Sequence, residues 1–196
     1  MRARRGSFRL DADINSKGVI CLAGKNGAGK STLARAIAGF LPIEDGYVKV
    51  GGVDVTHFPV EEKGVVLITP DSAFLHMDVD SHLRWGAKLK GTSLGAAKVS
   101  RVKSELGIDF SGKVGMLSIG MRERVALASG LLAAPRAILV DDVFSNLHDK
   151  EDFIARYGRL TDESGIDLLF TTQDENDGKL AGRLYVVRNG STAVVA

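Results

Sequence analysis

The spacing of apolar residues predicts strands and helices that alternate along most of this chain. Four short apolar runs are typical of buried strands and lie at Val19–Ala23, Val65–Ile68, Ala137–Val140 and Asp167–Thr171. Apolar residues recur instead at helical intervals in residues 32–39, 81–107, 120–135 and 149–165. This alternation of strand and helix signals indicates an α/β fold.

The two ends of the chain carry the pattern of more exposed strands. Apolar and polar residues alternate from Phe8 to Ile14, which is typical of a half-exposed strand. Residues 183–188 and 191–196 flank Asn189-Gly190, a strong signal for a β-hairpin. A further strand is expected at Tyr47–Val50, after a turn at residues 44–46. On the first helix, we expect Leu33, Ile37 and Phe40 to share the apolar face.

Residues 24–31 read GKNGAGKS, which is a complete phosphate-binding loop between a predicted strand and a predicted helix. Its glycines let backbone N–H groups turn toward phosphate oxygens, and the following helix offers its positive end to the same anion. Lys30 supplies charge to the β- and γ-phosphates, and the Ser31 hydroxyl can ligate Mg²⁺. The residues expected to bind nucleotide here are Gly24, Asn26, Gly27, Ala28, Gly29, Lys30, Ser31 and Thr32. The alternative, a glycine-rich turn without a ligand, is disfavoured because the flanking strand and helix are both present.

Composition is that of one globular domain. The chain has 196 residues, of which 44% are hydrophobic and 26% charged, and its net charge is +2. This balance gives no argument for nucleic acid, and we expect the arginines at positions 2, 4 and 5 to form a solvated end. The single cysteine, Cys21, lies in an apolar strand, so we expect no disulfide and a reducing compartment. No apolar run has the length of a membrane span, and no signal peptide is expected.

Several motifs after the phosphate-binding loop occur in the order found in ABC-type ATPases. Residues 117–121, LSIGM, with the continuation RERVALA, resemble the LSGGQ signature of that family. The strand 137–140, which ends in Asp141-Asp142, resembles a Walker B strand, and residues 145–148 resemble the D-loop. Residues 171–174 fall where the family has its switch histidine, and residues 74–79 resemble the stretch after the Q-loop. The resemblance runs from about residue 7 to residue 196.

The resemblance implies a fold and an architecture. It implies a P-loop NTPase core with a mixed sheet, N-terminal antiparallel β strands and a short helical subdomain insert. Residues 1–196 would form a single ABC-type nucleotide-binding domain, with the helical subdomain at about residues 70–115. The family works as head-to-tail dimers that hold ATP between the phosphate-binding loop of one subunit and the signature of the other.

The family also implies roles for individual residues, with ATP and Mg²⁺ as cofactors. Ser118 and the backbone at Gly120 would clamp the γ-phosphate bound to the opposite subunit. Asp141, together with Ser31, would hold Mg²⁺. The residues expected to serve catalysis are Asp142, which would orient or activate water, Gln173, which would contact the γ-phosphate, and Lys30. Phe8 is the candidate for stacking on adenine, and a core strand position is an equally weighted alternative.

Several positions depart from the family pattern, and the departures concern hydrolysis rather than nucleotide binding. Asp142 replaces a glutamate and is one methylene shorter, and a displacement of about 1 Å can cost on the order of 10²-fold in rate. Gln173 replaces the switch histidine, and His148 replaces the D-loop aspartate. The Q-loop glutamine falls at Thr69 or Pro70, and Ile119 and Met121 alter the signature. These changes predict intact nucleotide binding and weakened hydrolysis, unless each is a tolerated variant of an active enzyme.

The leading hypothesis is therefore the ATP-binding subunit of an ABC transporter, cytoplasmic and held at the inner face of the membrane by an integral membrane permease. The dimer of nucleotide-binding domains is a homodimer or a heterodimer, and no nucleic acid is expected. One alternative is a degenerate ATP-binding partner in an asymmetric dimer, and another is a soluble ABC ATPase without a transport role. Residues 6–11 and 74–79 most resemble importers of the molybdate and tungstate group.

Overall fold

A nine-stranded mixed sheet organises the protein in a computed structural model, which describes residues 1–195. Its strand order is β4-β1-β2-β11-β10-β3-β9-β8-β7. The strands are β1 (Arg2–Arg5), β2 (Phe8–Asp11), β3 (Val19–Ala23), β4 (Ile43–Asp45), β7 (Val65–Ile68), β8 (Ala137–Val140), β9 (Asp167–Thr172), β10 (Arg183–Arg188) and β11 (Ser191–Val195). Strands β10, β3, β9, β8 and β7 run parallel, whereas β1 pairs antiparallel with β2 and with β4. A small separate ladder joins β5 (Lys49–Val50) and β6 (Val53–Asp54). The mixed α/β fold with N-terminal antiparallel strands is thus confirmed.

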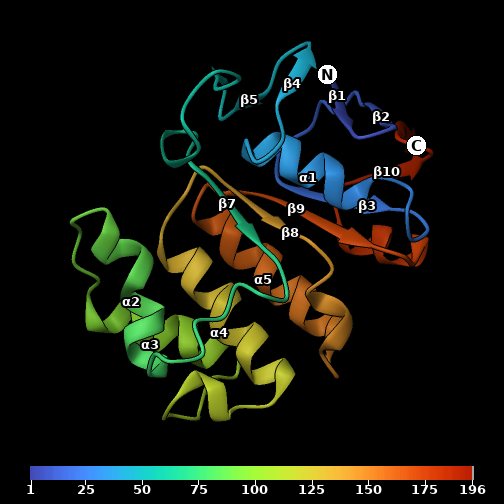
Figure 1. The fold of residues 1–196 in the computed structure, drawn as a ribbon. Coiled ribbons are helices and arrows are strands. Elements are labelled where there is room, and N and C mark those ends of the chain that lie inside the picture. The colour runs from blue at the N-terminus through green and yellow to red at the C-terminus, as the bar shows by residue number, and fades with distance from the viewer. Residues whose placement is uncertain (196) are drawn as a thin grey trace.

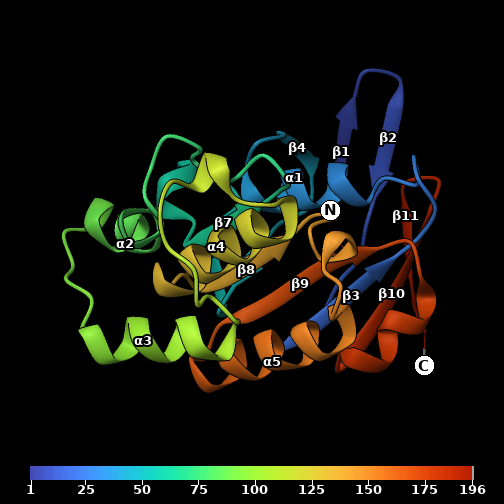
Figure 2. The same ribbon diagram turned by 90° about the horizontal axis from the view of Figure 1, so that it is seen from below.

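Helices cover both faces of this sheet, and further helices lie beyond one end of it. They are α1 (Lys30–Ala38), α2 (Val79–Leu89), α3 (Ala96–Glu105), α4 (Ile119–Leu132) and α5 (Lys150–Glu163). Short 3₁₀ turns lie at η1 (Val60–Glu62), η2 (Val114–Met116), η3 (Phe144–Asn146) and η4 (Glu175–Leu180). Figure 2 shows α1 on one face of the sheet and α5 on the other. Figure 1 places α2, α3 and the start of α4 at one end of the molecule, and β1, β2 and β4 at the opposite end.

The predicted apolar face of α5 is confirmed, and it anchors the larger of the two main hydrophobic clusters. Phe153, Ile154 and Tyr157 are fully buried, and Leu160 is 4% exposed. The Tyr157 hydroxyl donates a hydrogen bond of 2.9 Å to the Leu127 carbonyl on α4, which ties the two helices together. The second cluster lies on the α1 side of the sheet and includes residues of β2, β3 and α1. The hairpin at Asn189-Gly190 also forms as predicted, as β10 and β11, with Ala196 outside the described residues.

Two local expectations are wrong. Phe40 is 62% exposed, because α1 ends at Ala38 and Gly39 turns the chain at a φ of 91°. The arginines at 2, 4 and 5 are exposed, as expected for a solvated end, but they also lie in a strand, β1, that was not predicted; Arg2 lies 3.2 Å from Asp45, and Arg4 lies 3.3 Å from Glu44. Glu44 and Asp45 accordingly extend a strand, β4, instead of forming a turn. These ion pairs join β1 to β4 at a polar edge whose register shifts between Arg2 and Ala3.

Within residues 1–195, none of the helices combines the length and the apolar character that a membrane crossing demands. Cys21 is fully buried in β3, as expected for a small core residue. Burial raises the pKa of its thiol to about 12, and the nearby carboxylate of Asp177 acts in the same direction. The thiol is therefore protonated at neutral pH and has little nucleophilic character.

Candidate nucleotide-binding site

The phosphate-binding loop joins the carboxyl end of β3 to the first turn of α1. Its start is fixed to the neighbouring strand, because the Gly24 N–H donates to the Thr172 carbonyl at 3.1 Å. The loop ends at Gly29, which has a φ of 114° and directly precedes Lys30 at the start of α1. The structure therefore contains the predicted strand, loop and helix in the predicted order along the chain.

Lys30 is folded over its own loop and is only 7% exposed. Its Nζ donates to the carbonyl of Gly24 at 2.7 Å and to that of Lys25 at 3.2 Å. Burial lowers the pKa of Lys30, and the charges of Asp142 and Asp141 oppose that change. The charges of both carboxylates that follow β8 therefore act on this ammonium, as expected for a cation at a phosphate site.

Ser31 and Asp141 meet where α1 and β8 approach one another. The Ser31 hydroxyl donates to Asp141 Oδ1 at 3.0 Å, and the Thr171 hydroxyl donates to the same oxygen at 3.0 Å. Asp141 is 6% exposed, so its carboxylate is held in one orientation. A hydroxyl beside a carboxylate fits Mg²⁺, which prefers oxygen ligands and takes only one or two from the protein when phosphates and water supply the rest. Within residues 1–195 no cluster of three or more His, Cys, Asp or Glu side chains forms a metal site by itself, so the described residues would supply part of a coordination shell.

Asp142 follows with an unusual backbone. Its φ is 58°, in the left-handed region that residues other than glycine adopt at a cost. The Asp142 N–H donates to Thr171 Oγ1 at 2.9 Å, and the Ser145 hydroxyl donates to the Asp142 carbonyl at 3.1 Å. The main chain is therefore held at both polar groups while the side chain is exposed. This geometry turns the carboxylate out of the strand toward solvent.

Thr171 was missed by the sequence reasoning, although its hydroxyl bonds both the Asp141 carboxylate and the Asp142 backbone. It accepts from the Asp142 amide and donates to the Asp141 carboxylate. Thr171 follows Phe170, which pairs in register with Val140 on β8. A polar residue at the end of a predicted strand was the available signal, but the order of the strands in the sheet had first to be known.

Phe8 lies against the phosphate-binding loop itself. A Cβ built on Gly29 would come within 2.8 Å of the Phe8 ring, and one built on Gly190 would come within 3.2 Å. The ring is half-buried and packs against the cluster on the α1 side of the sheet. These contacts place the Phe8 ring against the phosphate-binding loop.

The remaining residues of the predicted loop divide into exposed and anchored positions. Asn26 and Gly27 are exposed. Ala28 is 8% exposed, and its carbonyl accepts from the Gly190 N–H at 2.8 Å, so the β10–β11 turn supports the loop. Thr32 is 8% exposed and lies in the first turn of α1. Gln173 follows the last residue of β9 and is exposed.

Ser118 and Gly120 lie at a different part of the molecule. Ser118 caps α4, and its hydroxyl accepts from the Met121 N–H at 3.3 Å. Figure 1 shows the start of α4 and the start of α1 far apart, so one chain does not bring the signature to its own phosphate-binding loop. The signature instead borders a hollow of about 410 Å³ with the D-loop residues Asn146, Leu147 and His148.

A buried carboxylate that the sequence reasoning also missed links the signature helix to the D-loop. Glu123 on α4 is 3% exposed, and its Oε1 accepts from the Asn146 side chain at 2.6 Å. Within residues 1–195, its Oε2 has no hydrogen-bond partner. Burial raises the pKa of Glu123, and this effect outweighs the opposing hydrogen bond from Asn146. No sequence pattern marked this residue, because it reads as a polar position on a helix.

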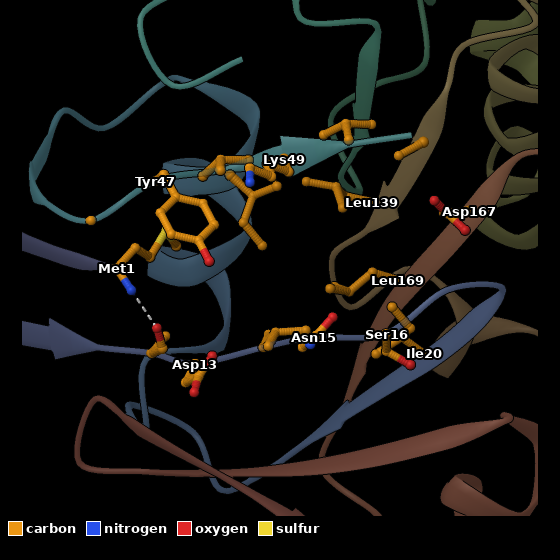
Figure 3. A pocket seen from close by; sticks show the side chains of 17 residues that line it. Met1, Asp13, Asn15, Ser16, Ile20, Tyr47, Lys49, Leu139, Asp167 and Leu169 are labelled. Carbon is orange, nitrogen blue, oxygen red and sulfur yellow. Dashed lines mark hydrogen bonds between the residues drawn. The ribbon is translucent and has the colours of Figure 1, made fainter. Parts of the chain in front are cut away.

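A further cavity lies away from the nucleotide site. It has a volume of about 670 Å³ and is lined by residues such as Met1, Asp13, Tyr47, Lys49 and Asp167. Figure 3 shows these side chains around the opening, with the Met1 ammonium hydrogen-bonded across it. Asp167 starts β9, whereas the phosphate-binding loop follows the end of β3, so the two sites lie at opposite strand ends. Among residues 1–195, the wall contains no buried side-chain polar atom that lacks a partner.

Comparison with known proteins gives one consistent family. Residues 8–145 match the family described as "ABC transporter". The chain is 31% identical to the Fe(3+) ions import ATP-binding protein FbpC of Streptomyces avermitilis, over 94% of this chain and 56% of that protein. It is 32% identical to the thiamine import ATP-binding protein ThiQ of Jannaschia sp., over 100% of this chain and 90% of that protein. The chain thus spans little more than half of the iron protein and most of the thiamine protein.

Solved structures agree on the fold. The chain matches a structure titled as the ATP-binding subunit of an ABC transporter with a TM-score of 0.81 and 20% identity, over 99% of this chain and 87% of that one. A nucleotide-free ATP-binding cassette from an ABC transporter matches with a TM-score of 0.78 and 22% identity, over 100% of this chain and 87% of that one. At these identities the match concerns the fold alone.

Proposed function

Because this chain belongs to the ABC transporter family, we propose that residues 1–196 form a single nucleotide-binding domain that binds Mg²⁺-ATP and hydrolyses it. The helical subdomain is assigned to about residues 70–115. The observation that carries the proposal is the convergence of Lys30, Ser31 and Asp141, with a hydroxyl–carboxylate contact of 3.0 Å beside a buried ammonium. These are the groups that an ATP phosphate chain and its cation require in one place.

We propose that the active form is a head-to-tail dimer. In a single chain, Ser118 and the start of α4 lie far from the phosphate-binding loop. A second copy or a related subunit could present its own Ser118 and the amides near Gly120 to the nucleotide, where the positive end of a helix favours an anion. The exposed side chains of Met116 and Ile119, 87% and 64% accessible, border that surface and support its burial on dimerisation.

Individual residues of the chain then have separate roles in hydrolysis. Lys30 would hold the phosphates, and Ser31 and Asp141 would hold Mg²⁺, which when bound would supply positive charge to the phosphate oxygens. Asp142, turned outward by its backbone, orients the attacking water and accepts its proton. Gln173 donates an amide hydrogen bond to the γ-phosphate. Because Asp142 is shorter than glutamate and Gln173 cannot titrate, we propose that turnover is slow.

Transport is the wider role that we propose for the complete assembly. The subunit would be cytoplasmic and bound to the inner face of the membrane through an integral permease, as the named import relatives suggest. The solute is a separate question, because the permease and its partners contact it. Residues 6–11 and 74–79 favour molybdate or tungstate, whereas the named relatives import iron(III) and thiamine. Transport assays with the cognate permease and each of these solutes would decide between them.

Nucleotide binding by the purified chain tests the central proposal. Wild type should bind ATP and dimerise when ATP and Mg²⁺ are added, as measured by fluorescence titration and light scattering. Lys30→Ala should abolish both, whereas Lys25→Ala, at an exposed position of the same loop, should bind as wild type does. Equal ATP affinity in the Lys30→Ala and wild-type proteins would overturn the proposal.

The rate proposal has its own test. Asp142→Glu combined with Gln173→His should raise phosphate release severalfold without a change in ATP affinity. The degenerate-partner alternative is favoured if wild type binds ATP tightly but releases phosphate at background rate. Unchanged turnover in the double variant would refute the argument that these two side chains limit hydrolysis.

A further inference from the structure

A partly buried ion pair joins the end of the D-loop to the segment that follows Gln173. Lys150, the first residue of α5, donates from Nζ to Asp177 Oδ2. Asp177 lies in η4, and its side chain is 5% exposed, while that of Lys150 is 28% exposed. Removal of Lys150 would leave the buried Asp177 carboxylate without its cation, which is destabilising, so the place of this pair between two functional segments calls for an explanation.

On one side, the pair reaches Gln173 through a single hydroxyl. Thr172, the residue before Gln173, donates from Oγ1 to the same Asp177 oxygen that binds Lys150. Thr172 Oγ1 also accepts from the N–H of Asp174, the residue after Gln173, at 3.1 Å. Both neighbours of Gln173 are thus tied to one hydroxyl, whose direction is set by the Asp177 carboxylate.

The same strand end is also tied to the phosphate-binding loop. The Thr172 carbonyl accepts from the Gly24 N–H at 3.1 Å. A shift of Thr172 therefore moves the backbone before Gln173 relative to the loop that carries the phosphates. Gln173 itself is exposed, so its backbone anchor is the chief constraint on where its amide points.

On the other side, Lys150 directly follows the D-loop and Asp149. The Asp149 carboxylate accepts from Arg124 on the signature helix and from Arg156 on α5. Arg124 also donates to the Leu106 carbonyl at the end of α3, at 2.7 Å. The start of α5 is thereby fixed both to the signature helix and, through Lys150, to the switch segment.

We propose that the Lys150–Asp177 pair positions Gln173 for reaction and couples that position to the D-loop. Lys150 and Asp177 are positioning residues, because neither reaches the site of the γ-phosphate directly. The inference rests on the proposed ATPase function. When the partner subunit displaces the D-loop on dimer closure, the start of α5 moves, and Lys150 carries that movement through Asp177 and Thr172 to Gln173.

A second ion pair supplies a matched control between the same two elements. Lys179 in η4 lies 3.2 Å from Glu151 in α5, with side chains 58% and 63% exposed. It therefore bridges α5 and η4 without a bond to Thr172 and without burial. Exposed pairs of this kind contribute little to stability.

The test compares Lys150→Met, Lys150→Arg and Lys179→Met with wild type in ATP turnover and ATP binding. Lys150→Met should lower kcat by about 10- to 100-fold, because misplacement of a reacting group by about 1 Å has effects of this size. The KM for ATP should stay within twofold, because the Lys30 and Asp141 contacts are untouched. Lys150→Arg should recover most of kcat, and Lys179→Met should match wild type in both quantities.

Hydrogen exchange gives a second readout that does not depend on turnover. In wild type, ATP with Mg²⁺ should slow amide exchange in the phosphate-binding loop and in residues 172–180. In Lys150→Met, protection of the loop should persist while protection of 172–180 is lost. If Lys150→Met fails to fold, Asp177→Asn, which keeps the shape and one acceptor oxygen, takes its place in both measurements.

The outcomes separate the two proposals. Wild type that binds ATP but shows no turnover contradicts the proposed hydrolysis, and the exchange data then still decide the role of the pair. Unchanged kcat and unchanged protection in Lys150→Met refute the positioning role and leave the ATPase function standing. An equal loss of kcat in Lys179→Met shows that any bridge between α5 and η4 matters, and it also refutes the specific role of the buried pair.

Discussion

Replacement of Gly190 by alanine should disrupt the support of the phosphate-binding loop. Gly190 has a φ of 83° in the turn between β10 and β11. Its N–H donates to the Ala28 carbonyl and its carbonyl accepts from the Asp11 N–H, both at 2.8 Å. An alanine Cβ would lie 2.1 Å from the Arg9 carbonyl oxygen, a backbone atom that cannot rotate away. The turn must therefore move, and both hydrogen bonds move with it.

The size of the effect follows from these contacts. A residue with a Cβ in the left-handed region costs about 1–2 kcal/mol. Each of the two hydrogen bonds contributes about 0.5–1.5 kcal/mol if it is lost. Together these terms predict a loss of about 2–5 kcal/mol in the free energy of unfolding, which corresponds to a fall in Tm of roughly 4–20 °C for a domain of this size.

Gly52 provides the control for the conformational term. Its φ of 81° nearly equals that of Gly190, but a Cβ there would meet no atom within 4 Å. Gly52→Ala should therefore lose only about 1–2 kcal/mol. Thermal unfolding followed by circular dichroism measures both variants, and fluorescence titration measures their ATP affinity. Gly190→Ala should bind ATP more weakly, since it loses the hydrogen bond to Ala28, whereas Gly52→Ala should not.

The steric argument is refuted if Gly190→Ala is no less stable than Gly52→Ala. The claim that the turn shapes the phosphate-binding loop is refuted if Gly190→Ala is destabilised yet binds ATP with wild-type affinity at a temperature where it is folded. In that case the β10–β11 turn would hold the sheet together without shaping the loop.

Three further predictions concern other contacts. Burial raises the pKa of Glu123, so the folded protein binds a proton more tightly than the unfolded chain and stability is lost as pH rises from the unfolded pKa, about 4.3, through the folded one. Glu123→Gln should therefore gain Tm relative to wild type as pH rises over that interval, and a difference that is independent of pH would contradict the assignment. Asp141→Asn should weaken ATP binding about 10- to 100-fold in Mg²⁺ but not in excess EDTA; equal loss in both conditions would remove Asp141 from the metal. Tyr157→Phe should lose about 1 kcal/mol by removing the bond to the Leu127 carbonyl, seen as a lower urea midpoint, whereas Tyr47→Phe, at a side chain 62% exposed, should show no change.

The sequence predicted the parts of this structure that depend on local patterns. The strand at Ala137–Val140 was predicted with the bounds that it has, because a short apolar run followed by two carboxylates is a local signal. The buried face of α5 followed from helical spacing in the same way. Phe40 was misplaced because Gly39 ended the helix within the assumed apolar stripe. The strand β1 was missed because its cross-strand ion pairs become visible only when the partner strands are known.

The parts of the site that could not be predicted are those in which distant segments share one hydrogen-bonding group. Thr171 forms hydrogen bonds with both Asp141 and Asp142, and Asp177 accepts from both Lys150 and Thr172. Each of these side chains is ordinary in its local sequence. Its importance comes from parallel strands that end at the same sheet edge, so that residues about 30 apart in the chain become neighbours.

Most of the departures from the family pattern are exposed, whereas Met121 and Thr69 are partly buried. Asp142, His148 and Gln173 are exposed in the single chain, and Ile119 is 64% accessible. Lys30 and Asp141, which keep the family residue, are buried and hydrogen-bonded within the chain. Exposed substitutions usually change stability by less than about 0.5 kcal/mol, so folding of the subunit places little constraint on the altered positions. Any constraint on them must come from the nucleotide and the opposing subunit. Asp142, His148, Gln173 and Ile119 are thus accessible to a partner that could supply the missing groups, which is why turnover should be measured in the dimer that forms with ATP.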